Sequence, residues 1–153
     1  MKNAVIAGTF DPVTIGHLDI IKRAASMFDK VTVGVFENAA KSTMFSAEVR
    51  TEAMRASVSD IPNVTVEPAS DITLADFAKT HDAVIVKGIR NSLDADYEIS
   101  LAEINMETGG VETVMLATSS GLSFVSSTFV REMIKYGKPY EKYVPKGAYE
   151  VIK

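Results

Sequence analysis

Short runs rich in Val and Ile alternate with longer amphipathic segments, and this alternation is the feature that most constrains the fold. Five apolar runs bounded by Gly or polar residues predict strands at 3–8, 31–37, 64–68, 83–88 and 112–118. Apolar residues at three- and four-residue spacing predict helices at 17–28, 46–59, 72–80, 92–108 and 126–136. Strands that alternate with helices in this way indicate βαβ units and a parallel sheet.

The 153 residues are expected to form a single α/β domain, Rossmann-like and doubly wound, around a five-stranded parallel sheet. The runs 3–8 and 83–88 are almost entirely apolar, which is typical of strands covered on both faces. No internal repeat, low-complexity tract or linker divides the chain. We therefore treat residues 1–153 as one domain.

Composition narrows the classes of function. The formal charge of −4 and the lack of a basic stripe argue against a general nucleic-acid binder, but they leave room for a small anionic ligand. The absence of cysteine removes disulfides, thiol nucleophiles and thiolate metal sites. No apolar run is long enough for a signal peptide core or a membrane span. We expect a cytoplasmic protein that binds neither nucleic acid nor membrane.

The stretch "GTFDPVTIGH" follows the first predicted strand, and ligands of open parallel sheets bind beyond the carboxyl ends of the strands. It is neither the GxGxxG fingerprint nor a GxxxxGK[ST] phosphate loop. Thr14 is predicted to cap the next helix, which places Gly16 and His17 in a first turn suited to a phosphate. A cationic histidine is disfavoured at that end of a helix. We interpret His17 as a donor to a phosphate oxygen, the alternative being a solvated residue.

Other strand ends supply cations and hydroxyls. Lys41 lies in the loop after the second strand, and Lys87 and Arg90 flank Gly88 after the fourth. Two cations around a glycine predict a polyphosphate cradle, the alternative being a charge pair that precedes a helix. Three consecutive hydroxyl residues stand where the last predicted helix begins, although ordinary capping needs one: Ser126, Ser127 and Thr128.

The chemistry that these residues favour is nucleotidyl or phosphoryl transfer. The chain has no nucleophile elbow and no HExxH-type metal pair, and His81 is interpreted as a surface histidine near a helix end. Cations, hydroxyls and helix N-termini at one crevice suit a reaction in which positioning and charge stabilisation supply most of the catalysis. A phosphate monoester nucleophile, with a second pKa of about 6, would need no general base.

At this point the motifs resemble a known family. Residues 14–17, Thr-Ile-Gly-His, resemble the [HT]xGH signature of nucleotidyltransferases. With "AAKSTMFS", "KGIRNSLDADYEISLAEIN" and "SFVSSTFVRE", nearly the whole chain resembles the bacterial phosphopantetheine adenylyltransferase family. The resemblance implies that ATP and 4′-phosphopantetheine give dephospho-CoA and pyrophosphate with Mg²⁺. It also implies a homohexamer that CoA inhibits.

The resemblance assigns roles to individual positions. The catalytic residues it implies are His17, Lys41 and Arg90. The ATP-binding residues it implies are Thr9, Phe10, His17, Gly88, Ile89, Arg90, Glu98, Leu122, Ser123, Phe124, Val125, Ser126, Ser127 and Thr128. The residues it implies for the other substrate are Thr9, Lys41, Leu74, Lys87, Tyr97, Leu101 and Asn105, and it implies no metal ligand. Three positions depart from the usual pattern: Lys87 replaces an arginine, Leu122 an aromatic residue and Thr73 a leucine.

Two other functions remain open. One is a different [HT]xGH nucleotidyltransferase acting on another phosphomonoester, such as nicotinamide mononucleotide or glycerol phosphate. The other is a non-catalytic nucleotide-binding module of regulatory type, which would not need His17. An inactive paralogue is disfavoured by the presence of Thr14, His17, Lys41, Arg90 and Ser127.

Overall fold

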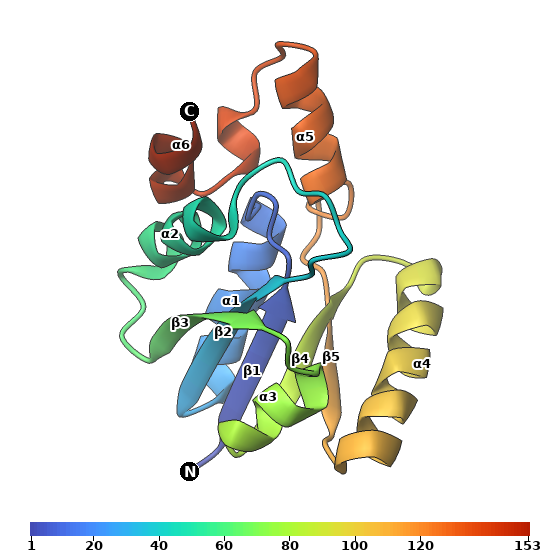
Figure 1. The fold of residues 1–153 in the computed structure, drawn as a ribbon. Helices are drawn as coiled ribbons and strands as arrows, with labels where there is room; N and C mark the ends of the chain where they lie inside the picture. The colour runs from blue at the N-terminus through green and yellow to red at the C-terminus, as the bar shows by residue number, and fades with distance from the viewer.

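The computed structural model describes residues 1–153 and alternates strands with helices as predicted (Figure 1). The strands are β1 (Asn3–Gly8), β2 (Lys30–Glu37), β3 (Val64–Ser70), β4 (Ala83–Ile89) and β5 (Thr113–Ala117). The helices are α1 (Ile15–Met27), α2 (Ala47–Val58), α3 (Leu74–Thr80), α4 (Ser92–Gly109), α5 (Ser127–Lys135) and α6 (Lys146–Ile152). A 3₁₀ helix, η1 (Glu141–Tyr143), precedes α6.

The sheet has five strands in the order β3-β2-β1-β4-β5, and every neighbouring pair is parallel. From β1 the chain adds β2 and β3 on one side, and then returns to add β4 and β5 on the other. The direction of winding therefore reverses between β1 and β4, where a doubly wound sheet opens a crevice at its carboxyl edge. The predicted α/β architecture is confirmed, and the nearly apolar runs are β1 and β4, two of the three interior strands.

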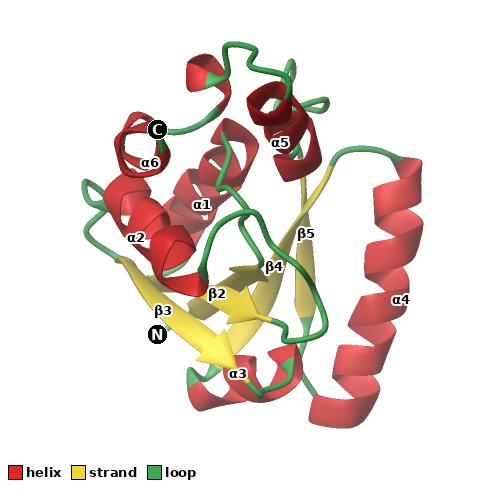
Figure 2. Cartoon of the chain, turned by 45° about the horizontal axis from the view of Figure 1, so that its top comes forward, coloured by secondary structure: helices red, strands yellow, loops and turns green.

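Helices lie on both faces of the sheet (Figure 2), and an apolar core lies on each face. Alternate residues of β1 divide between them: Ala4 and Ile6 join the core under α1, α2 and α6, while Val5 joins the core under α3. Helix α4 contributes no buried residue to either core. This helix runs along the β5 side of the sheet, and its contacts are with α3 and β4 (Figure 1).

The structure departs from the predicted elements mainly at helix ends and in the last 13 residues. Helix α1 begins at Ile15, two residues before the predicted start, because Thr14 provides the cap. Helix α6 and η1 were not expected. Helix α6 is seven residues long and packs closely on α2: a Cβ added to Gly147 would lie 2.5 Å from the carbonyl oxygen of Ala56. So short a segment gives little periodic signal.

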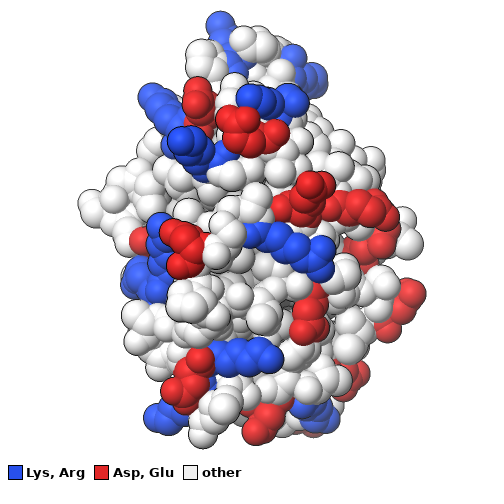
Figure 3. All heavy atoms as spheres, turned by 90° about the vertical axis from the view of Figure 1, so that its left-hand side faces the viewer, with Lys and Arg blue, Asp and Glu red and all other residues white.

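The surface mixes charges of both signs. On the face drawn in Figure 3, acidic and basic side chains lie next to one another instead of forming separate fields. No helix is both long enough and apolar enough to cross a membrane.

Candidate active site

A cavity of about 390 Å³ opens at the carboxyl ends of β1 and β4, where the winding reverses. It is lined by β1, the loop to α1, the first turns of α1 and α5, residues 41–42, β4 and the start of α4. Of the site residues predicted from the sequence, the cavity brings together Thr9, Phe10, Thr14, Gly16, His17, Lys41, Lys87, Gly88, Arg90, Glu98, Leu122, Val125, Ser126, Ser127 and Thr128.

Seven predicted residues do not line this cavity: Leu74, Ile89, Tyr97, Leu101, Asn105, Ser123 and Phe124. Leu74 begins α3, and Tyr97, Leu101 and Asn105 lie on α4, which contacts α3. The Tyr97 side chain is 65% exposed. Four of these seven residues, on α3 and α4, therefore form a group outside the cavity, while Ile89, Ser123 and Phe124 lie on β4 and in the segment before α5.

The first turn of α1 is fixed by reciprocal hydrogen bonds between Thr14 and His17. The His17 backbone N–H donates to Thr14 Oγ1 at 3.3 Å, and the Thr14 backbone N–H donates to His17 Nδ1 at 3.0 Å. This is a capping box in which histidine replaces the usual glutamate or glutamine. The predicted Thr14 cap is confirmed.

The hydrogen bond from the Thr14 N–H to Nδ1 also determines which tautomer the His17 ring adopts. Because Nδ1 accepts the Thr14 N–H, the proton of the neutral ring must be on Nε2, which is then a donor. Burial, and secondarily the Arg90 cation, lower the pKa of His17 to about 4. The ring of Phe10 meets the imidazole edge to face at 5.0 Å between centroids. His17 is thus a neutral, oriented donor at neutral pH, so the helix dipole does not oppose it.

The N-terminus of α5 faces the same cavity, and its three hydroxyls have different partners. Ser126 is the N-cap, accepting from the Phe129 N–H at 3.0 Å. Ser127 donates to the Pro12 carbonyl at 2.8 Å, and Thr128 Oγ1 accepts from Arg131 at 3.1 Å. Only one hydroxyl is needed to cap the helix. The second fastens α5 to the loop before α1, so that two helix N-termini border one space.

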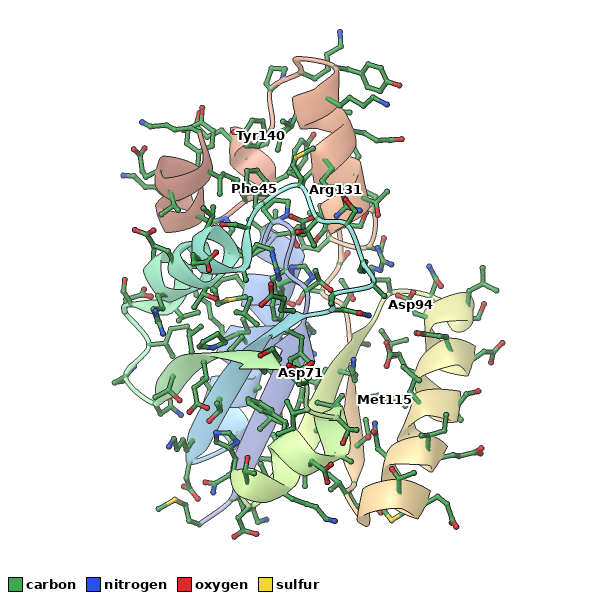
Figure 4. All side chains as sticks on the ribbon, viewed as in Figure 1. Phe45, Asp71, Asp94, Met115, Arg131 and Tyr140 are labelled. Atoms are coloured by element: carbon green, nitrogen blue, oxygen red, sulfur yellow. The ribbon has the colours of Figure 1, made fainter.

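The lysines and arginines at the cavity are largely paired. Arg90 Nε lies 2.9 Å from Asp94 Oδ2, and its hydrogen bond lowers the pKa of the Asp94 carboxyl. Lys87 Nζ lies 3.6 Å from Glu98 Oε2, a buried oxygen with no hydrogen bond. Lys41 makes no ion pair. Figure 4 places Asp94 at the start of α4 and Arg131 on α5, both at the carboxyl end of the sheet.

Comparison with known proteins agrees with this geometry. A family model for cytidylyltransferase-like proteins matches residues 5–133. A phosphopantetheine adenylyltransferase of Bacteroides fragilis is 42% identical over 148 residues, which are 96% of this chain and 98% of that protein. One of Moorella thermoacetica is 44% identical over 154 residues, covering 99% of this chain and 96% of its own.

The chain belongs to the phosphopantetheine adenylyltransferase family. The resemblance inferred from its motifs is confirmed, and the chain is a nucleotidyltransferase. A solved structure with the same fold is a bifunctional NMN adenylyltransferase/ADP ribose pyrophosphatase of Francisella tularensis, complexed with AMP and a manganese ion. Its TM-score is 0.67 at 17% identity, and the match covers 94% of this chain and 44% of that one.

The three departures from the family pattern have different structural settings. Thr73 caps α3, its hydroxyl accepting from the Asp76 N–H at 3.1 Å, which a leucine cannot do. Leu122 lines the cavity but supplies no aromatic surface. Lys87 lies next to Gly88, where an added Cβ would come within 2.9 Å of Ile20 on α1. Gly88 therefore permits the close approach of α1 to β4 beside the cavity.

Sequence reasoning assigned no site role to three charged residues that line the cavity, Asp11, Asp94 and Arg131. Asp94 follows Arg90 by four residues, a spacing that indicates an ion pair once the helix is recognised. Asp11 gave no such signal, because its partners are backbone N–H groups more than 30 residues away. The lining carries four Lys or Arg side chains and three carboxylates.

His81, interpreted as a surface histidine near a helix end, is the C-cap residue of α3, and its ring is hydrogen-bonded instead of freely solvated. Its side chain is 17% exposed, with Nε2 3.0 Å from Glu67 Oε2 on β3. Its Nδ1 lies 2.8 Å from the Phe77 carbonyl oxygen, and the imidazole packs against the Phe77 ring at 4.6 Å between centroids. His81 therefore links α3 to β3 and lies outside the cavity.

Proposed function

We propose that this protein transfers the adenylyl group of ATP to 4′-phosphopantetheine, forming dephospho-CoA and releasing pyrophosphate. Membership of the family supports the pair of substrates. The observation that carries the proposal is the His17 Nε2–H, a fixed donor at a helix N-terminus inside the cavity. A donor held in place before the reaction stabilises developing negative charge at no cost of reorganisation.

The proposed step is a displacement at the α-phosphorus of ATP. A phosphate oxygen of 4′-phosphopantetheine forms the new P–O bond, and the bond to the bridging oxygen of the β-phosphate breaks, so pyrophosphate leaves with that electron pair. The attacking oxygen carries no proton when the phosphate is dianionic, and therefore no general base is required. His17 Nε2–H and the free N–H groups of the first turn of α1 would donate to the α-phosphate oxygens.

The cations have separate roles in this proposal. Lys41, which makes no ion pair, would bind the phosphate of 4′-phosphopantetheine. Arg90 and the N-terminus of α5 would bind the other phosphates of ATP. Leu74, Tyr97, Leu101 and Asn105 would contact the pantetheine arm outside the cavity, and CoA, which contains the same arm, would inhibit by occupying both places.

Mg²⁺ is proposed to enter with the phosphates of ATP. No group of three His, Cys, Asp or Glu side chains in the structure has the geometry to hold a metal ion, and both oxygens of Asp11 already accept backbone N–H groups. Mg²⁺ retains water and phosphate oxygens readily in such sites, and it would reduce the repulsion between the phosphates.

A homohexamer in the cytoplasm, where ATP is abundant, is the proposed form of the protein. Support for assembly comes from apolar residues exposed on α4 and β5: Leu93, Tyr97, Ile99, Ile104, Met106 and Val114. By their spacing, Leu93, Tyr97 and Ile104 share one face of α4, and an exposed apolar face marks an interaction site. Sedimentation of the wild type should give a mass of six chains, and Ile104→Asp should lower that mass. A single-chain mass for the wild type would contradict the assembly.

The decisive test is release of pyrophosphate from Mg-ATP and 4′-phosphopantetheine. Parallel reactions with nicotinamide mononucleotide and glycerol phosphate distinguish the other nucleotidyltransferases that the sequence left open. We expect release with 4′-phosphopantetheine well above either alternative. Release no greater than in the protein-free control, with ATP still bound, would instead support a nucleotide-binding regulatory module.

A further inference from the structure

Asp11 and Arg50 are two buried charged residues to which the proposed chemistry gives no role. Asp11 is 4% exposed and lies in the loop between β1 and α1. Arg50 is 2% exposed and lies in the first turns of α2, outside the cavity lining. Charged side chains are rarely buried to this extent unless paired or fully hydrogen-bonded, so each calls for an explanation.

The Asp11 carboxylate holds the segment that precedes α2. Its Oδ1 accepts from the Phe45 N–H and its Oδ2 from the Met44 N–H, both at 2.9 Å. From the other side, Arg131 donates to the Asp11 carbonyl at 2.7 Å, and its guanidinium lies 3.8 Å from Asp11 Oδ2. The carboxylate thus joins the β1–α1 loop to residues 44–45, with an α5 cation to balance its charge.

Arg50 contacts the same two segments, residues 44–45 and the β1–α1 loop, through their backbone carbonyls. Its Nε donates to the Phe45 carbonyl at 3.1 Å, and its Nη1 donates to the carbonyls of Thr9 at 2.7 Å and Phe36 at 3.0 Å. None of these acceptors is a carboxylate, and Arg50 forms no salt bridge. A buried guanidinium bonded only to backbone carbonyls fixes chain segments relative to one another.

We propose that Asp11 and Arg50 are positioning residues that clamp residues 41–45 onto the β1–α1 loop and so set the distance between Lys41 and His17. Met44 and Phe45 receive the clamp, and Lys41 lies three residues before Met44. Thr9, which Arg50 holds by its carbonyl, lines the cavity together with His17. An error of about 1 Å between the two phosphate-binding groups is enough to slow a transfer reaction strongly.

The clamp differs from the role usually given to an acidic residue near phosphates. A metal ligand or general base presents a free oxygen to the ligand, whereas both Asp11 oxygens face N–H groups of the chain. The proposal rests on the proposed function where it assigns the acceptor phosphate to Lys41. The hydrogen bonds themselves are tested without any substrate.

The first arm measures amide hydrogen exchange in the ligand-free protein. In Asp11→Asn, the side-chain amide can accept from one of the two N–H groups but must turn its NH₂ toward the other. We expect exchange at Met44 and Phe45 to accelerate about tenfold, the effect of losing roughly 1.4 kcal/mol. Asp60→Asn, an exposed carboxylate with no hydrogen bond, is the matched control and should leave these amides unchanged. Unaltered exchange in Asp11→Asn would overturn the clamp.

The second arm measures kinetics with both substrates. We expect Asp11→Asn and Arg50→Gln to lower kcat and to raise KM for 4′-phosphopantetheine about tenfold, with KM for ATP and the half-maximal Mg²⁺ concentration within twofold of wild type. Arg50→Lys keeps the charge and should recover part of the loss, while Arg55→Gln, on the exposed face of α2, is the control. A shifted Mg²⁺ requirement in Asp11→Asn would overturn the clamp in favour of a metal ligand.

The two experiments test the clamp and the proposed function independently of each other. If the wild type releases no pyrophosphate, the proposed function fails, while the exchange rates of Met44 and Phe45 still decide whether the clamp exists. If Arg50→Gln does not fold, Arg50→Lys takes its place in both arms, and normal exchange at Phe45 in that variant together with normal KM values contradicts a role for Arg50.

Discussion

The first turns of α1 and α4 border the same cavity but are supported in different ways. Helix α1 buries Ile20, Ile21 and Ala24 in the main core, whereas α4 buries no residue. His17 is held by the Thr14 N–H and the Phe10 ring, while Arg90, with a side chain 37% exposed, is held by Asp94. Core packing thus fixes the α1 side of the site, and an ion pair at the surface fixes the α4 side. The first is expected to be rigid and sensitive to substitution, the second adjustable.

The largest expected effect is a fall in kcat when His17, on the α1 side, is replaced. His17→Ala removes a fixed donor, and we expect kcat for pyrophosphate release to fall by about 10²- to 10³-fold while ATP still binds. The variant also leaves the Thr14 N–H without its acceptor, which should cost about 1 kcal/mol of unfolding free energy. His17→Gln is the matched variant, because its side-chain oxygen restores the capping box without an imidazole. A His17→Ala enzyme with more than a tenth of wild-type turnover would contradict the assignment.

The sequence predicted the main residues of the α1 side, but it predicted few of the contacts that hold these residues in place. Thr14 and His17 are three residues apart, so their capping relation follows from local spacing. The tautomer of His17 did not follow, because it depends on the direction of one N–H bond. Asp11 and Arg50 were missed because their partners are backbone groups brought near by the fold. A backbone N–H or carbonyl carries no sequence signature of its own.

On the α4 side, sequence patterns predicted the helix but not its exposure. Residues 92–108 were predicted as a helix from the spacing of their apolar residues, yet the helix buries none of them and keeps Tyr97 in solvent. Periodicity shows which residues share a face but not whether another element, or another chain, covers that face. The same limit explains why the contact of His81 with Glu67 was not predicted, since Glu67 lies on β3, 14 residues away in the sequence.

The second prediction concerns the unfolding free energy at acid pH, and it tests the α1 side alone. The pKa of His17 is about 4 in the folded chain and 6.5 ordinarily, so the unfolded chain binds the proton more readily between these values. The neutral imidazole therefore contributes stability that is complete above pH 6.5 and is lost as the pH falls toward 4, in total on the order of 3 kcal/mol. Urea unfolding of wild type and His17→Gln at pH 7, 6, 5 and 4.5 measures it. The wild type should lose more stability than the variant, whereas parallel pH curves would show that His17 does not titrate in this way.

A smaller effect is expected on the α4 side. Arg90→Gln removes a cation from the cavity and leaves Asp94 only the backbone N–H of residue 90 as a donor from that position, so KM for ATP should rise about tenfold, equivalent to one charge-assisted hydrogen bond. Because the pair is partly exposed to solvent, which screens it, the unfolding free energy should change by less than about 1 kcal/mol. Steady-state kinetics and urea unfolding of the same preparation give both values. A stability loss as large as that of a core substitution would remove the contrast between the two sides.

The smallest effect is expected at Lys87, on the strand between the two sides. Its Nζ is too far from Glu98 Oε2 for a hydrogen bond, and that buried oxygen has no other partner. Lys87→Arg supplies a longer side chain with five donors, enough to bond Glu98 and still face the cavity. We expect the unfolding free energy to rise by up to about 1 kcal/mol and KM for ATP to fall two- to threefold. Lys79→Arg, an exposed lysine on α3, is the control for adding a guanidinium. If Lys87→Arg raises KM instead, Glu98 already has the orientation that ATP needs, and its unpaired oxygen belongs to the nucleotide site.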